Sequence, residues 1–172
     1  MKRLTTCCAW IVLIGVFHLA VPYNGHTAQV SDKAPEFELN DLQGVHHRLS
    51  AYREKVVVIN FWASWCPECI AEMASLNSLY EKYRGKGLIV LGISADRKRE
   101  PVMKVLTQTR VTYPVLLDST GGVFIRNYTV VGLPTTVVID KNGLIAERVM
   151  GRTDFTSAAF MNKIESLISR AK

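Results

Sequence analysis

Continuous apolar runs alternate along the chain with segments in which apolar residues recur every three or four positions. The runs predict strands buried in a sheet, and the periodic segments predict amphipathic helices. Strands are expected over residues 36–40, 46–49, 56–59, 88–94, 113–118, 135–140 and 144–150, and helices over 66–83, 100–109, 122–128 and 155–169.

This order of elements predicts the fold class. Strands alternate with helices and are followed by a hairpin and a last helix, which predicts an α/β domain of three layers, with a central mixed sheet and helices on both faces. The first two strands form an N-terminal β-hairpin around the turn Gln43-Gly44. His46 and His47 are adjacent in it and point to opposite faces, which argues against a joint metal site, and both are expected at the surface.

The N-terminal 28 residues differ from the rest of the chain. A basic head, Met1-Lys2-Arg3, precedes an apolar stretch over residues 9–21 and a polar stretch that ends at Ala28. This order is typical of a secretory signal, so residues 1–28 are expected to be a signal peptide or signal anchor and residues 29–172 the folded domain. His26 is not the small residue expected near a cleavage site, so an uncleaved membrane anchor through 9–21 remains open. In either case we expect a periplasmic or other extracytoplasmic location.

The charge of the chain points to no nucleic-acid partner. From Gln29 onward, 19 lysines and arginines stand against 15 aspartates and glutamates. The basic run 97–99 is flanked by Asp96 and Glu100 and lacks the aromatic interleaving of a nucleic-acid surface, which favours a solvated loop.

Cys66 and Cys69 stand where the strand over 56–59 leads into a helix. The first turn of a helix presents free N–H groups and the positive end of the helix dipole, which stabilise a thiolate. Cys66 at the N-cap is therefore the predicted nucleophile, and Pro67 suits the first helical position. Cys69, one turn later, lies within disulfide reach and is the predicted resolving thiol.

Other interpretations of this cysteine pair are weaker. A zinc site needs further ligands, and the only other cysteines, Cys7 and Cys8, lie in the signal segment. A purely structural disulfide across so short a loop restricts the unfolded chain little. The pattern therefore favours a redox-active pair that needs no cofactor or metal.

Two motifs together resemble the thioredoxin fold: Trp65-Cys66-Pro67-Glu68-Cys69 after a strand, and Gly132-Leu133-Pro134-Thr135-Thr136 before a later one. The opening Ala34-Pro35-Glu36-Phe37, the inserted helix and strand over 100–117 and the signal segment resemble the exported ResA/TlpA-like branch, which is related to the AhpC/TSA proteins and includes reductases of cytochrome c maturation. The resemblance covers about residues 30–168.

The resemblance implies roles for particular residues. Pro134 matches a cis-proline that faces the disulfide, and the backbone of Leu133 would meet an extended substrate, with Trp65 and Pro67 as further substrate contacts. Trp65 is expected on a flat apolar rim where a partner protein rests.

Two acidic residues near the cysteines have different expected roles. Glu72 matches a buried glutamate of this branch, which with a raised pKa could exchange a proton with Cys69. An exposed helix residue is the alternative for Glu72. Glu68 is expected to be exposed and to oppose the Cys66 thiolate modestly, which makes the site less oxidising.

The function implied is an exported thiol-disulfide oxidoreductase that reduces a disulfide-containing protein, possibly apocytochrome c, and is itself reduced by a membrane thiol carrier of the CcdA/DsbD type. Three alternatives remain: a copper-delivery protein that uses both sulfurs as ligands, a disulfide-donating oxidase, and a thiol peroxidase of the peroxiredoxin type. The peroxidase needs Thr or Ser three residues before its cysteine, where this chain has Ala63.

Overall fold

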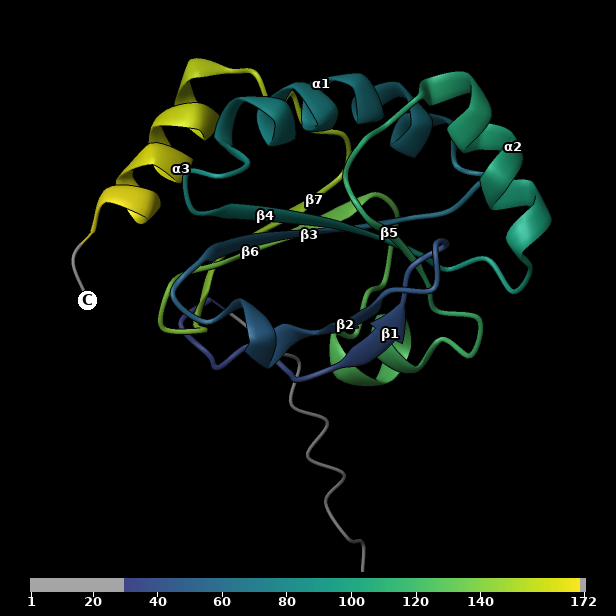
Figure 1. Cartoon of the computed structure of the whole chain (residues 1–172), viewed down its shortest axis with the longest axis horizontal. Helices are drawn as coiled ribbons and strands as arrows, with labels where there is room; N and C mark the ends of the chain where they lie inside the picture. Colours follow the sequence, from purple (N-terminus) through teal and green to yellow (C-terminus); the bar gives the residue numbers. More distant parts are fainter. Residues whose placement is uncertain (1–29, 171–172) are drawn as a thin grey trace, which may run out of the picture.

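The computed structural model describes residues 30–170, which build a five-stranded mixed sheet covered on both faces (Figure 1). The strands lie in the order β5-β4-β3-β6-β7; β3, β4 and β5 are parallel, and β6 is antiparallel to both β3 and β7. Their bounds are β3 Val56–Trp62, β4 Leu88–Ser94, β5 Val115–Leu117, β6 Thr135–Ile139 and β7 Ile145–Met150. The predicted mixed sheet is confirmed.

The two faces of the sheet are covered by different kinds of segment. The helices α1, α2 and α3 lie together over one face, and the hairpin β1–β2 with two short helical segments, η1 and η2, covers the other (Figure 1). The bounds are α1 Pro67–Tyr83, α2 Arg99–Thr109, α3 Ala158–Ser169, β1 Glu38–Asn40, β2 His46–Arg48, η1 Leu49–Tyr52 and η2 Gly122–Asn127. The three-layer arrangement is as predicted.

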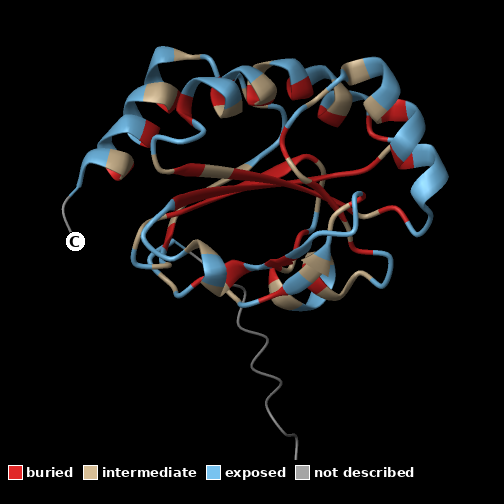
Figure 2. Ribbon diagram, viewed as in Figure 1, coloured by how far each residue is buried: buried red, intermediate tan, exposed pale blue. Residues whose placement is uncertain are grey.

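Strand β3 lies at the centre of the sheet and is buried along its whole length (Figure 2). Because successive side chains point to opposite faces, one strand supplies both cores. Those toward the helices are Val56, Val58 and Trp62, and those toward the hairpin and η2 are Val57, Ile59 and Phe61. Each such side chain contributes about 1.5–3 kcal/mol by its burial. This makes the end of β3 a rigid support for the residues that follow it.

Two sequence expectations are wrong in detail. His47 is buried, not at the surface: its Nε2 lies 3.1 Å from Asp41 Oδ2 and its Nδ1 lies 2.5 Å from the hydroxyl of Tyr52. The hairpin packs against the sheet, so one of the two adjacent histidines must face inward. The last helix begins at Ala158 instead of residue 155, because the Ser157 hydroxyl caps it by accepting a hydrogen bond from a backbone N–H.

The expected signal segment lies outside the described residues. Within residues 30–170, no helix combines the length and apolar character that crossing a bilayer requires.

Candidate functional site

Cys66 and Cys69 are joined by a disulfide where β3 gives way to α1. Cys66 is the N-cap residue, and its sulfur accepts a hydrogen bond from the backbone N–H of Cys69 at 3.2 Å. Pro67 occupies the first helical position, as expected for a residue without an N–H. Cys66 borders an open groove, whereas Cys69 is fully buried. A partner thiol can therefore reach the first sulfur and not the second.

The turn between β3 and Cys66 is held by a buried carboxylate from the neighbouring strand. Asp96 accepts hydrogen bonds from the backbone N–H of Ser64 at 2.8 Å and from its hydroxyl at 2.6 Å, and a third from the hydroxyl of Ser94 at 2.7 Å. Asp96 was not predicted as a site residue. Its position just beyond a parallel strand was the available signal, because such strand ends meet at one edge of the sheet.

Glu72 lies one turn beyond Cys69 and is only 1% exposed, which excludes the alternative of a surface helix residue. Its carboxylate accepts hydrogen bonds from the side-chain amide of Asn60 and from the backbone N–H of Thr153, both at 2.8 Å. Burial raises the pKa of the Glu72 carboxyl above its ordinary value, and these two hydrogen bonds oppose the rise. The site thus contains a buried group that can hold a proton. Neither Asn60 nor Thr153 was predicted.

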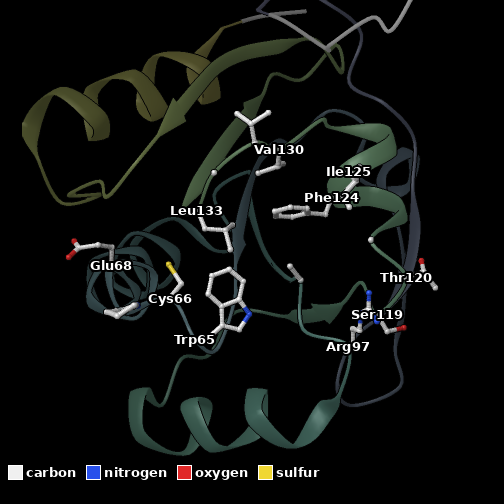
Figure 3. A pocket seen from close by; sticks show the side chains of 15 residues that line it. Trp65, Cys66, Glu68, Arg97, Ser119, Thr120, Phe124, Ile125, Val130 and Leu133 are labelled. Atoms are coloured by element: carbon white, nitrogen blue, oxygen red, sulfur yellow. The ribbon is translucent and has the colours of Figure 1, made fainter. Parts of the chain in front are cut away.

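The peptide bond between Leu133 and Pro134 is cis, at the start of β6. Pro134 is buried, and its carbonyl accepts a hydrogen bond from the backbone N–H of Gly151 at 2.9 Å. Leu133 is half-buried and lines the same groove as Cys66 (Figure 3). The cysteine motif and the proline motif therefore lie side by side, although 66 positions separate Pro67 of the first from Leu133 of the second.

The groove beside Cys66 has a volume of about 840 Å³. Trp65, Pro67 and Leu133, three of the expected substrate contacts, line the groove; Trp65 and Leu133 lie near the Cys66 sulfur (Figure 3). The opposite wall of the groove comes from η2 and from residues 130–132, which were not predicted as site residues. For residues 130–132 the signal was their position next to Leu133 in the proline motif, whereas η2 carries no motif that marks it as part of the site.

Glu68 is exposed and borders the groove on the side of Cys66 (Figure 3). Its carboxylate lies 3.7 Å from the guanidinium of Arg152, which follows β7. The negative charge between the cysteines therefore has a cation beside it. Among residues 30–170, no group of three His, Cys, Asp or Glu side chains is placed to hold a metal ion.

A Cys-x-x-Cys disulfide at the start of the helix after the central strand, with a cis-proline before a neighbouring strand, is the arrangement of thioredoxin-fold proteins. The chain belongs to the AhpC/TSA family, whose model matches residues 30–148. It is 39% identical over 122 residues to the thiol-disulfide oxidoreductase ResA of Geobacillus kaustophilus, which covers 71% of this chain and 70% of that relative.

Solved structures agree with this assignment. A Chlorobium tepidum protein, with the proposed identity of a thiol:disulfide interchange protein DsbE, superimposes with a TM-score of 0.76 at 32% identity, over 83% of this chain and 99% of that one. A thiol-disulfide oxidoreductase of Bacteroides fragilis superimposes with a TM-score of 0.68 at 28% identity, over 79% of this chain and 99% of that one. On its fold, its disulfide and these relatives, the chain is a thiol-disulfide oxidoreductase.

Proposed function

We propose that this oxidoreductase works outside the cytoplasm as a reductase of protein disulfides, with Cys66 as the nucleophile and Cys69 as the resolving thiol. The observation that carries the proposal is the unequal placement of the two sulfurs. Cys66 borders the groove at the positive end of α1, and Cys69 is buried one turn below it. A helix N-terminus favours the thiolate form, and only the thiolate attacks a disulfide.

The reaction moves two electrons from this dithiol to the partner. The Cys66 thiolate attacks one sulfur of the partner's disulfide; a mixed disulfide forms, the partner's S–S bond breaks, and the departing sulfur takes up a proton. The Cys69 thiolate then attacks the Cys66 sulfur. The Cys66–Cys69 bond forms, the mixed disulfide breaks, and the second partner thiolate leaves and is protonated. The partner ends as a dithiol and this chain as a disulfide.

Glu72 is proposed to take the proton of Cys69 before the second attack. The carboxyl is buried on the same side of α1 as Cys69, and its raised pKa lets it hold a proton nearer to neutral pH than an exposed glutamate does. Trp65, Pro67 and Leu133 are proposed to form the surface on which the partner segment rests, with the buried Pro134 holding the backbone of Leu133 in place.

The biological setting is proposed from the sequence and the relatives. The signal segment predicted over residues 1–28 supports an extracytoplasmic location. The resemblance to the ResA/TlpA-like branch, with a thiol-disulfide oxidoreductase ResA among the relatives, supports a role in cytochrome c maturation. The substrate would then be apocytochrome c or a protein that delivers it. A reductase in an oxidising compartment needs electrons from the membrane, so a thiol carrier of the CcdA/DsbD type is the proposed donor.

Two measurements test the proposal. The reduction potential of the Cys66–Cys69 couple in dithiothreitol or glutathione buffers should lie well below the poise of the compartment; a value at the strongly oxidising end would make the protein an oxidase. In cells, Cys69→Ser should accumulate a mixed disulfide with its substrate through Cys66, and Cys66→Ser should accumulate none. Equal trapping by both variants would overturn the assignment of the nucleophile.

A further inference from the structure

Exposed apolar side chains gather around the groove beside Cys66. Of the eight large apolar residues that are exposed within residues 30–170, three line this groove: Trp65, Ile125 and Val131, at 70%, 63% and 79% exposure. Exposed apolar surface costs free energy in water, and its concentration at one place marks an interaction site. Trp65 follows β3, whereas Ile125 and Val131 belong to a segment 60 or more positions later, so the fold brings the two parts of the surface together.

The wall opposite Cys66 is held by hydrogen bonds within the chain. The segment η2 is a π-helical turn, in which the N–H of Tyr128 donates to the carbonyl of Val123 at 3.0 Å. The buried carboxylate of Asp118 accepts hydrogen bonds from the backbone N–H of Gly122 at 2.9 Å and of Phe124 at 2.8 Å. A wall held in this way loses little conformational entropy when a partner binds.

Across the groove from Cys66 lies a single cation, Arg97 (Figure 3). No acidic side chain within residues 30–170 lies within ion-pair distance of its guanidinium. The carboxylate of the preceding Asp96 accepts hydrogen bonds from Ser64 and Ser94. Glu68 also borders the groove, but on the side of Cys66, where it pairs with Arg152. The wall opposite Cys66 therefore combines apolar side chains with a positive charge that has no ion-pair partner among residues 30–170. Arg97 is exposed, as expected for a loop residue, but it also lines the site.

We infer that the groove selects substrate segments in which the attacked cysteine has an apolar neighbour, seated against Ile125 and Val131, and an acidic side chain that pairs with Arg97. The inference rests on the proposed function and deepens it by naming the substrate class. The apolar contact supplies affinity, because it removes exposed apolar surface from water on both partners. The ion pair supplies selectivity between segments, because a like charge at that point is repelled.

The charge half is tested with the full folded domain in its dithiol form and with synthetic peptides. Each peptide carries one cysteine as a mixed disulfide with glutathione, a neighbouring leucine, and Asp, Asn or Lys placed in turn at each of five positions on either side. Peptide reduction is followed as a second-order rate constant. We expect at least one position at which Asp reacts about two- to fivefold faster than Asn at low salt, as for an exposed ion pair, with the advantage lost at high salt.

Charge reversal at Arg97 has a matched control in the same loop. Arg97→Glu should remove the preference for Asp and create one for Lys at the same position. Lys98→Glu makes the same change in net charge at an exposed residue that does not line the groove, and it should leave the preference intact. Equal effects of the two variants, or no positional preference in the unmodified protein, would overturn the inference.

The apolar half is tested by Ile125→Ser and Val131→Ser, with Met103→Ser on α2 as the exposed apolar control away from the groove. The groove variants should slow reduction of the leucine peptides several-fold more than they slow reduction of a small disulfide such as hydroxyethyl disulfide, whereas Met103→Ser should show no such difference. Equal losses of the peptide reduction rate in all three variants would overturn the inference that substrates contact Ile125 and Val131. Reduction of every peptide at one rate refutes only the selectivity, whereas a dithiol that reduces no peptide and no protein disulfide refutes the proposed function and the inference with it.

Discussion

The side-chain amide of Asn60 donates a hydrogen bond of 2.8 Å to the carboxylate of Glu72, inside the layer between β3 and α1. The same amide nitrogen lies 3.1 Å from the hydroxyl of Thr136 on β6, so two strands and the active-site helix meet at one polar point behind the disulfide. The other amide atom, Asn60 Oδ1, is buried and has no hydrogen-bond partner. A buried polar atom without a hydrogen-bond partner costs folding free energy, and this one lies in the cluster that surrounds the proposed proton acceptor.

Asn60→Ala should raise the pKa of Glu72 further, because a hydrogen bond donated to a carboxylate stabilises its charged form. Under the proposed proton exchange between Glu72 and Cys69, the shift should appear in the pH dependence of the Cys69 thiolate absorbance. Thr136→Val is the matched control, since it removes the second partner of Asn60 and leaves the bond to Glu72. In a Glu72→Gln background, Asn60→Ala should produce no shift; a shift there would mean that Asn60 acts on the cysteines by another route.

Glu72 should also make the oxidised protein less stable as the pH rises. A carboxyl whose pKa is raised in the folded state binds its proton more tightly there than in the unfolded chain. Its contribution to the free energy of unfolding is therefore complete below the ordinary pKa and is lost as the pH rises through the pKa of the folded state. Unfolding in urea should show wild type losing stability relative to Glu72→Gln by up to about 1.4 kcal/mol per pH unit in this window. The exposed Glu100→Gln should follow wild type at every pH. Parallel curves for wild type and Glu72→Gln would contradict the effect.

Asp96→Asn should destabilise the oxidised protein by about 1–3 kcal/mol, because one of the oxygens that accept hydrogen bonds from Ser64 and Ser94 becomes a donor. Urea unfolding at neutral pH measures the change. Asp154→Asn is a suitable comparison: Asp154 accepts two bonds from Thr156 on the exposed surface, where water can replace them. Losses of the same size at both positions would show that burial of the Asp96 carboxylate is not the cause.

Glu68→Gln and Arg152→Gln should shift the reduction potential in opposite directions. A carboxylate near the Cys66 thiolate disfavours the reduced form, so its removal should raise the potential, and removal of the neighbouring guanidinium should lower it. Because both side chains are exposed, the shifts should be about 10–30 mV and should shrink at high salt. Equilibration with glutathione gives the values, and shifts of the same sign would rule out an electrostatic origin.

Much of the molecule was predictable because the governing interactions are local. The apolar runs of β3 and β4 require a sheet buried on both faces, and an N-cap cysteine followed by proline begins a helix wherever that sequence occurs after a strand. Trp65 and Leu133 were predicted as substrate contacts because each belongs to a motif that carries the family resemblance. For the same reason, the boundaries failed where packing intervened: Phe155 fits the helical period but lies before the cap of α3, fully buried against Phe160.

The sequence by itself determined that Cys66 and Cys69 form a reactive pair at the start of a helix, within a layered fold, since periodicity and capping act between residues a few positions apart. Only the tertiary structure decided what surrounds those sulfurs. The partners of Glu72 lie 12 and 81 positions away along the chain, and Asp96 lies 32 positions from the turn that it holds. Strand order and register bring these groups together, and they result from closing the whole sheet, which no short stretch of sequence specifies.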